Sequence, residues 1–157
     1  MSHLKEDIKM KHIISKYKIK LVKEEGARYE CENIITSPDD IEKIARNVLE
    51  MDRECEEVGV VIALNIKNKV LGTFEVSRGS LNSAIIHPRE VFKRLLLLNA
   101  NGFVFIHNHP SGSIEPSNED LLMSERLKQS GEVLGIDLID SCIISDSFLS
   151  MKQEGII

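Results

Sequence analysis

Residues 103–120 read FVFIHNHPSGSIEPSNED, an apolar run that leads directly into two histidines and a loop rich in proline and serine. A short apolar run of this type is typical of a buried β-strand. Side chains alternate along a strand, so His107 and His109 are expected to point to the same side. Ser117 then begins a helix, whose first turn would return Asp120 toward the two imidazoles.

Two histidines and one carboxylate that leave a fourth position open are typical of catalytic zinc. A glutamate from elsewhere in the chain would then act as general base for water. The same residues also have a structural interpretation. His107 and His109 could be a structural pair, and Ser117 with Asp120 matches a reciprocal helix-capping pair. The two interpretations are compatible, because Asp120 could bind a metal while Ser117 caps the helix.

Strands and helices are predicted on both sides of this segment. The sequence Ser37-Pro38-Asp39-Asp40 is a strong helix start, since serine caps, proline fits the first turn and acids face the positive helix end. Helices are expected at 38–51, 88–100 and 117–130, and strands at 58–64, 70–76, 81–86, 103–106, 136–144 and 148–151. This order predicts an α/β fold, an α+β sandwich with one mixed sheet flanked by about three helices.

Residues 1–36 are predicted to be a basic N-terminal extension, in which strands at 18–23 and 29–35 could form a hairpin. Residues 1–24 carry seven lysines and three acids. These lysines could contact DNA phosphates. The chain as a whole has a net charge of −5 and only 4% aromatic residues, which argues against general binding of nucleic acid.

Length and composition favour one globular domain. The chain has 157 residues, of which 42% are hydrophobic and 29% charged, and these values exclude a disordered or disulfide-stapled protein. Its cysteines, Cys31, Cys55 and Cys142, are widely spaced and odd in number, so we expect a reducing compartment and a cytoplasmic protein. No apolar run is long enough to span a membrane, and a membrane association is not expected.

The motif H-x-H-x10-D at 107–120 resembles the signature of JAMM (JAB/MPN) metalloproteases. The segments GSLNS at 79–83, HPREVF at 87–92 and LGIDLID at 134–140 are similar to the RadC-like branch of that family. The resemblance covers roughly residues 50–155 and implies a RadC-like JAMM domain at 37–157. It implies a fold of the JAMM or cytidine-deaminase type, in which a zinc site lies at the edge of a mixed sheet. Full-length RadC proteins usually carry an additional N-terminal helical region, so this chain looks like a short form.

The resemblance also implies roles for individual residues. His107, His109 and Asp120 take the zinc-ligand positions. Ser117 matches a serine that can support the oxyanion formed when hydroxide attacks a carbonyl. Its role as a helix N-cap remains an equally good interpretation.

The catalytic glutamate of the family lies at the start of a core strand. Glu57, directly before the predicted strand at 58–64, matches that position best, and Glu75 is the alternative. Glu57 also lies in an acidic run, where a solvated charge at a strand end is a sufficient explanation.

The chain departs from the family where RadC-like sequences usually continue Leu-x-Asp with a histidine, because Asp140 is followed here by Ser141. The loss of a histidine that supports the site or the substrate could weaken catalysis while metal binding remains. Cys142 could be a thiol ligand, but its apolar surroundings favour a buried structural cysteine. His87, before Pro88, is expected at a helix N-terminus as a cap or a supporting residue.

The predicted function is therefore a zinc-dependent hydrolase of JAMM type, a metallopeptidase or isopeptidase with an association to DNA repair implied by the RadC resemblance. Its substrate would be a peptide or isopeptide. Two alternatives remain open from the sequence. One is a nucleic-acid-associated accessory protein with a structural or nuclease metal site, and the other is a catalytically inactive JAMM scaffold.

Overall fold

The computed structural model describes residues 15, 16, 18, 20–23, 26, 33–79 and 86–157. Its centre is a five-stranded mixed sheet with the order β2-β1-β3-β4-β5. The strands are β1 (Glu57–Leu64), β2 (Val70–Gly79), β3 (Gly102–Asn108), β4 (Asp137–Ile144) and β5 (Phe148–Ser150). The helices are α1 (Pro38–Asn47), α2 (Pro88–Leu97) and α3 (Asn118–Leu134), with a short 3-10 helix, η1 (Met51–Arg53). The predicted α/β fold with a mixed sheet and three helices is confirmed.

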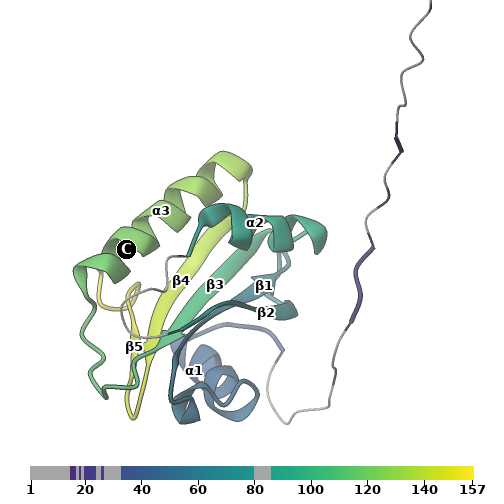
Figure 1. The fold of residues 1–157 in the computed structure, drawn as a ribbon. Helices are drawn as coiled ribbons and strands as arrows, with labels where there is room; N and C mark the ends of the chain where they lie inside the picture. The colour runs from purple at the N-terminus through teal and green to yellow at the C-terminus, as the bar shows by residue number, and fades with distance from the viewer. Residues whose placement is uncertain (1–14, 17, 19, 24–25, 27–32, 80–85) are drawn as a thin grey trace, which may run out of the picture.

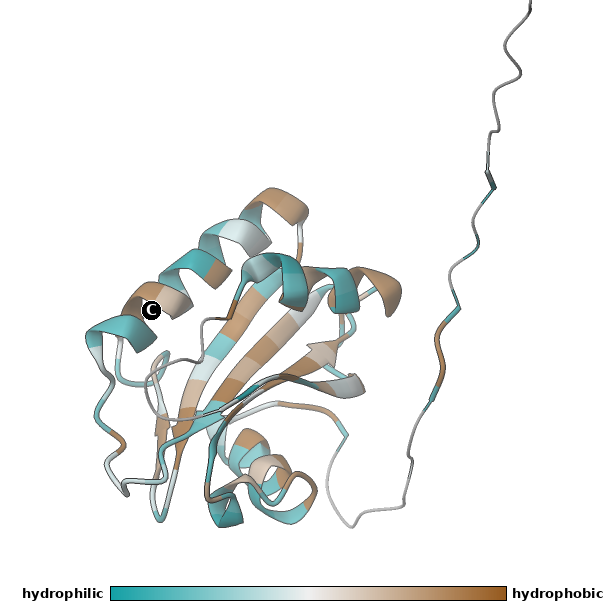
Figure 2. Ribbon diagram, in the orientation of Figure 1, coloured by the Kyte–Doolittle hydropathy of each residue, from teal (hydrophilic) through white to brown (hydrophobic). Residues whose placement is uncertain are grey.

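Helices cover both faces of the sheet, with α1 on one side and α2 and α3 on the other (Figure 1). Each side has its own hydrophobic cluster. Ile41 and Ile44 of α1 pack with Ile62 on the first side, and Val91 and Leu95 of α2 belong to the cluster on the second. The central strands are accordingly largely hydrophobic, whereas the helices alternate hydrophilic and hydrophobic segments (Figure 2).

Strand β3 carries the histidine motif through the middle of the molecule. It pairs with β1 in antiparallel and with β4 in parallel orientation, and all seven of its residues are buried. Such a strand, covered on both faces, accounts for its nearly continuous apolar sequence. It ends at Asn108, so His107 and His109 lie at the C-terminal end of this central strand.

The Asn108 side chain joins this end of β3 to the beginning of β1. Its Oδ1 accepts a hydrogen bond from the Val58 backbone N–H at 2.6 Å, and its Nδ2 donates to the Glu56 carbonyl at 2.8 Å. The Asn108 side chain therefore brackets Glu57 and fixes the first residue of β1 beside the last residues of β3.

The two helix starts expected from sequence are formed by capping boxes. At α1, Asp40 accepts hydrogen bonds from the backbone and hydroxyl groups of both Thr36 and Ser37. These bonds, led by the one from the Thr36 backbone, lower the pKa of Asp40. At α3, Ser117 and Asp120 form the reciprocal pair. Both boxes satisfy backbone N–H groups that a helix start leaves unpaired.

The predicted ends of all three helices differ from the structure. Helix α1 ends at Asn47 rather than near 51, and Glu50, with φ 50°, begins the separate 3-10 helix that follows. Helix α2 ends at Leu97 rather than 100, because Asn99 takes the left-handed conformation that we expected of the Asn101-Gly102 pair. Helix α3 continues past 130 to Leu134, and Gly135, with φ 68°, ends it. Asparagine and glycine tolerate this conformation better than other residues.

Much of the N-terminal hairpin prediction lies outside the described residues. The described part of 18–23 has no regular secondary structure, so the strand expected there is wrong for those residues. Of the strand expected at 29–35, residues 29–32 are not described, and Ile34 forms an isolated antiparallel bridge with Lys69. Residues 81–85 of the expected strand at 81–86 are likewise not described, and Ile86 lies outside any strand. No helix among the described residues has the length and apolar character needed to cross a membrane.

Candidate metal centre

Four side chains meet at the C-terminal end of β3. Glu57, His107, His109 and Asp120 each place one potential ligand atom within 4.8 Å of the others. The Nε2 atoms of His107 and His109 are 3.0 Å apart, and Asp120 Oδ1 is 3.0 Å from the Nε2 atom of His107. Asp120 Oδ2 is 3.4 Å from the Nε2 atom of His109. Two imidazole nitrogens and carboxylate oxygens that face one point form a donor set suited to zinc or a similar divalent ion.

Each of the two histidine rings is oriented by a neighbouring residue. His107 is 4% exposed, and its ring stacks on Phe105, with the centroids 5.6 Å apart and the planes inclined by 21°. The Nδ1 atom of His109 lies 2.8 Å from the carbonyl oxygen of Ser113. Because a carbonyl only accepts, Nδ1 carries the hydrogen, and neutral His109 would offer the lone pair of Nε2 to a metal.

Asp120 serves the helix and the site at the same time. Its Oδ2 accepts a hydrogen bond from the Ser117 backbone N–H at 2.8 Å, and its own backbone N–H donates to Ser117 Oγ at 3.2 Å. The carboxylate is thus held in place by the helix cap, while both of its oxygens face the histidines. The hydroxyl of Ser117 accepts in this arrangement, so its hydrogen is available for another acceptor.

The structure separates the two candidate glutamates. Glu57 is the first residue of β1, is half-buried and contributes to the group of four. Glu75, in β2, has a side chain that is 46% exposed and forms an ion pair with Arg78 at 2.8 Å. Of the two, only Glu57 therefore lies with the histidines in the described part of the chain.

The charges in the site are coupled. Burial by itself raises the pKa of Asp120, but hydrogen bonds from His107 and His109 outweigh it and hold that pKa well below the usual range. The hydrogen bond to Asp120 in turn raises the pKa of His109, with smaller contributions from the Ser113 carbonyl and the charge of Glu57. Without a metal, the site therefore favours an ion pair between protonated His109 and ionised Asp120.

This ion pair predicts how the stability of the metal-free protein depends on pH. The pKa of His109 is raised by folding, so its protonation stabilises the folded protein fully below about pH 6.5, the ordinary pKa of histidine. This contribution is lost as the pH rises through the raised pKa. The pKa of Asp120 is lowered by folding, so its ionisation stabilises the folded protein fully above about pH 3.8, the ordinary pKa of aspartate. This contribution is lost as the pH falls through the lowered pKa. In the presence of a chelator, the urea midpoint should be highest between these limits and should decline on both sides.

Zinc and a single substitution serve as controls for that measurement. Saturating zinc should remove the alkaline decline, because metal ligation uses the neutral form of histidine. The Asp120→Asn variant should lose much of the alkaline decline as well, since it has no charge to stabilise protonated His109. An alkaline decline of unchanged size in Asp120→Asn would assign the pH dependence to other groups.

Other residues named from the sequence lie apart from this group. Cys142 is fully buried, and burial raises the pKa of its thiol, as expected of a structural cysteine. Ser141 is also fully buried, and its hydroxyl lies 2.7 Å from that of Ser124. His87 is exposed at the N-cap position of α2 without a side-chain capping bond. Asn108 is the residue that sequence reasoning missed, although its place inside the HxH motif was a usable signal.

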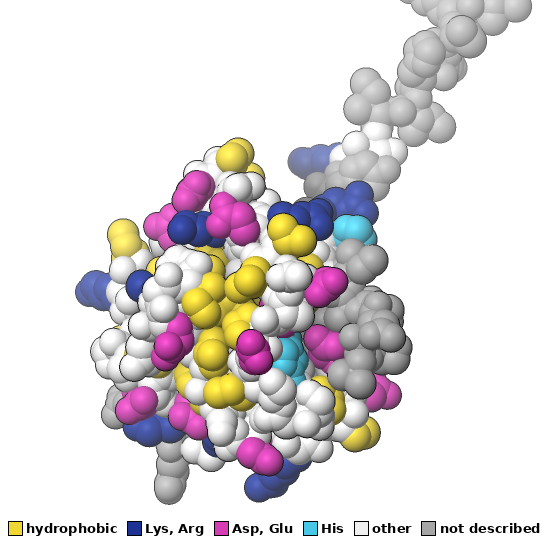
Figure 3. Space-filling model, turned by 90° about the vertical axis from the view of Figure 1, so that its left-hand side faces the viewer, with side chains coloured by type: hydrophobic (Ala, Val, Ile, Leu, Met, Phe, Trp, Pro, Cys, Tyr) yellow, Lys and Arg dark blue, Asp and Glu magenta, His cyan; other side chains and the backbone are white. Residues whose placement is uncertain are grey.

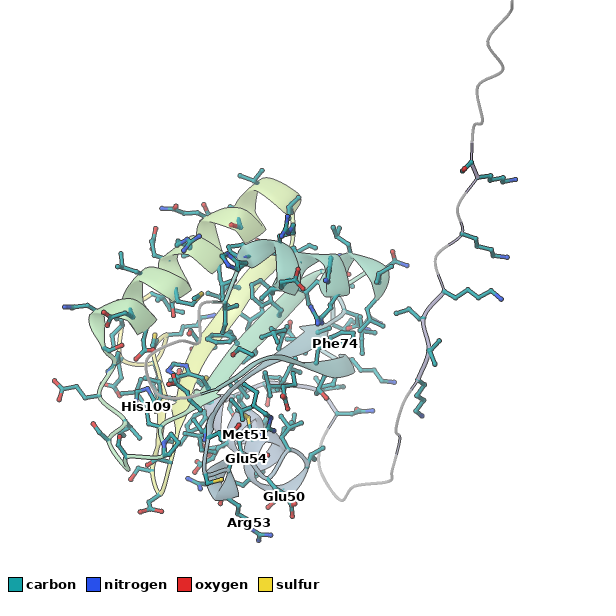
Figure 4. The ribbon with its side chains drawn as sticks, viewed as in Figure 1. Glu50, Met51, Arg53, Glu54, Phe74 and His109 are labelled. Carbon is teal, nitrogen blue, oxygen red and sulfur yellow. The ribbon has the colours of Figure 1, made fainter. Side chains whose placement is uncertain are left out.

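The group of four is partly exposed, since the side chains of His109 and Asp120 are 14% and 13% exposed. Figure 4 shows His109 beyond the end of β3, between the start of α3 and the segment that carries Met51 and Glu54. A pocket lined by Met51, Glu54, Asn108 and His109, among others, adjoins the group of four only at His109. On the face shown in Figure 3, histidine and acidic side chains surface beside a strip of hydrophobic side chains. This face of the molecule therefore presents both polar and apolar surface.

Comparison with known proteins gives one consistent result. The family model for the RadC-like JAB domain matches residues 35–156. A UPF0758 protein of Desulfitobacterium hafniense (strain DSM 10664 / DCB-2) is 42% identical over 126 residues, which are 79% of this chain and 54% of the relative. A UPF0758 protein of Clostridium botulinum (strain Alaska E43 / Type E3) is 44% identical over 124 residues, or 78% of this chain and 53% of the relative. The chain thus spans about half the length of these relatives.

Proposed function

The chain belongs to the RadC-like JAB domain family, and from this membership we propose that it is a zinc-dependent hydrolase that cleaves a peptide or isopeptide bond. One observation supports the proposal above all others. Glu57, His107, His109 and Asp120 come from three separate elements or their ends, and they place their ligand atoms within 4.8 Å of one another. Four such groups assembled and partly exposed at the ends of two central strands are suited to hydrolysis rather than to structural support alone.

His107, His109 and Asp120 would hold the ion through Nε2, Nε2 and a carboxylate oxygen. When bound, zinc acts as a Lewis acid and lowers the pKa of water in the site toward neutrality. Glu57 would not be needed as a ligand, since three protein ligands are usual in catalytic zinc sites. Its carboxylate is therefore available for proton transfer.

The proposed reaction uses Glu57 as general base and then as general acid. Glu57 takes a proton from the attacking water, whose oxygen forms a bond to the carbonyl carbon of the substrate. The carbon–nitrogen bond then breaks, and Glu57 returns the proton to the leaving nitrogen. The products are a carboxylic acid and an amine, which at neutral pH are present as a carboxylate and an ammonium group. The free hydrogen of the Ser117 hydroxyl could support the oxyanion that develops on the carbonyl oxygen.

Zinc-dependent turnover on two substrate classes tests this proposal. Protein loaded with zinc should release new amino groups from members of a panel of peptides and lysine-linked isopeptides, as detected by mass spectrometry. A chelator should stop the release, and added zinc should restore it. Cleavage that continues unchanged after complete removal of metal would contradict the proposed mechanism.

A further inference from the structure

A buried pair of hydroxyl groups connects α3 to the sheet one helical turn beyond Asp120. We propose that Ser124 and Ser141 are positioning residues that fix Asp120 relative to the histidines for metal binding. The inference rests on the proposed metal centre and adds the residues that maintain its geometry.

The contact between the two serines is direct and inaccessible to water. Their Oγ atoms are 2.7 Å apart, and both residues are fully buried. Ser124 follows Asp120 by four residues in α3, so the two side chains lie on the same face of the helix. The serine pair is therefore on the side of α3 that turns toward the sheet, directly behind the carboxylate.

The rest of α3 provides little that could define its position near Asp120. Its buried residues are Ser124, Leu127 and Gly131. Gly131 lies against the backbone of Ile136 at the far end of the helix, where an added Cβ would collide with the Ile136 carbonyl oxygen. Leu127 makes apolar contacts, which have no preferred direction. Apart from the contacts of the Asp120 carboxylate with the two histidines themselves, the Ser124 hydroxyl is thus the nearest directional contact to the sheet in the described part of α3.

The helix cap cannot replace this contact. Ser117 and Asp120 bond to each other within the first turn of α3, so their bonds orient the carboxylate on the helix but do not place the helix on the sheet. His107, in contrast, belongs to β3, and His109 follows directly after it and donates its backbone N–H to the Ile144 carbonyl of β4 at 2.9 Å. The distances between Asp120 and the two histidines therefore depend on how α3 is seated over β4.

Contacts of Ser141 can define the position of α3 relative to the sheet. Ser141 pairs with Phe105 where β4 lies beside β3, and the ring of Phe105 stacks on the ring of His107. The Ser141 carbonyl accepts a hydrogen bond from the Met151 backbone N–H at 3.0 Å, and Met151 Sδ also contacts Ser124 Oγ at 3.4 Å. A continuous set of short contacts thus links the helix of Asp120 to the strand of His107.

Alanine substitution of one serine and of both serines separates positioning from stability. The Ser124→Ala change leaves the buried Ser141 hydroxyl without its partner and should lower the unfolding midpoint. The Ser141→Ala change leaves the Ser124 hydroxyl with only the weak acceptor Met151 Sδ and should lower the midpoint less. The double change removes both hydroxyls and should bring the midpoint back toward that of the wild type. If the pair positions Asp120, however, zinc affinity in the double variant should still fall, by about tenfold, as for other residues that orient metal ligands.

Zinc affinity would be measured by competition with a chromogenic chelator, and ligand geometry by the visible absorption of the cobalt(II) form. Ser130→Ala is a matched control, because the Ser130 hydroxyl bonds within the helix to the Arg126 carbonyl at 2.7 Å. We expect weaker zinc binding and an altered cobalt spectrum in the double variant, with neither change in the control. If the double variant does not fold, Ser141→Cys, which keeps a side chain of similar size but only a weak donor, should show the same two changes.

Two results would overturn the inference, and they can be distinguished. Wild-type zinc affinity and an unchanged cobalt spectrum in a folded double variant would show that the pair serves packing only, while the metal centre stands. Failure of the wild-type protein to bind either ion would overturn the metal centre and the positioning role together.

Discussion

Replacing His107 and Asp120 together by alanine is expected to abolish zinc binding. The change removes one of the two imidazole nitrogens and the carboxylate, both oxygens of which lie within 3.4 Å of histidine Nε2 atoms. Loss of a residue that merely supports a ligand costs about 10–100-fold in metal affinity, so the loss of two ligands should cost far more. Competition titration with a chromogenic chelator measures this directly. Zinc at 100 times the dissociation constant should also stabilise the wild type by about 2.7 kcal/mol, and this gain should vanish in the variant.

A double variant of the same composition serves as the control. His87→Ala with Glu119→Ala also removes one histidine and one acid, but His87 is exposed at the start of α2 and Glu119 is exposed beside Asp120. The control should bind zinc like the wild type. Because Asp120 also caps α3, circular dichroism must show that the His107→Ala/Asp120→Ala protein is folded. Wild-type zinc affinity in that folded variant would place the ion somewhere else.

Replacing Glu57 by glutamine is expected to abolish hydrolysis while zinc remains bound. Glutamine keeps the size and hydrogen-bonding capacity of the side chain but cannot accept a proton at neutral pH. General acid–base groups typically contribute about 10²–10⁴-fold to the rate, so kcat should fall by about that factor. The measurement combines steady-state kinetics on a substrate found in the peptide and isopeptide panel with the zinc content of the same sample.

Glu75→Gln is the appropriate control for this experiment, because it makes the same chemical change in the neighbouring strand. Glu75 forms an ion pair with Arg78 and does not join the group of four, so its turnover should remain close to that of the wild type. Wild-type kcat in Glu57→Gln would remove Glu57 from the reaction. Loss of zinc in Glu57→Gln would instead make Glu57 a ligand.

Local patterns predicted the parts of the site that depend on neighbouring residues. The period-two alternation of a strand puts His107 and His109 together, and the spacing of Ser117 and Asp120 predicts the capping box that the structure contains. The apolar run at 103–106 lies within the central strand, and the serine–proline start at 37–38 lies at the beginning of α1. In each case the determining interactions lie within a few residues in sequence.

The parts that sequence could not define depend on contacts between distant residues. Glu57 could be favoured over Glu75 only by resemblance, because its position beside the histidines results from the pairing of β1 with β3 and from the bonds of Asn108. Similarly, the proposed role of Ser141 depends on its hydroxyl contact with Ser124, which lies 17 positions away in sequence. The end of α2 was misjudged because a left-handed residue such as Asn99 has no reliable signature in a single sequence.

The metal content of the purified wild-type protein tests the central claim most directly. Elemental analysis after zinc supply and removal of free metal should find close to one zinc ion per chain. No retained zinc under these conditions would contradict the proposed hydrolase, and Glu57, His107, His109 and Asp120 would then form a polar cluster without a metal.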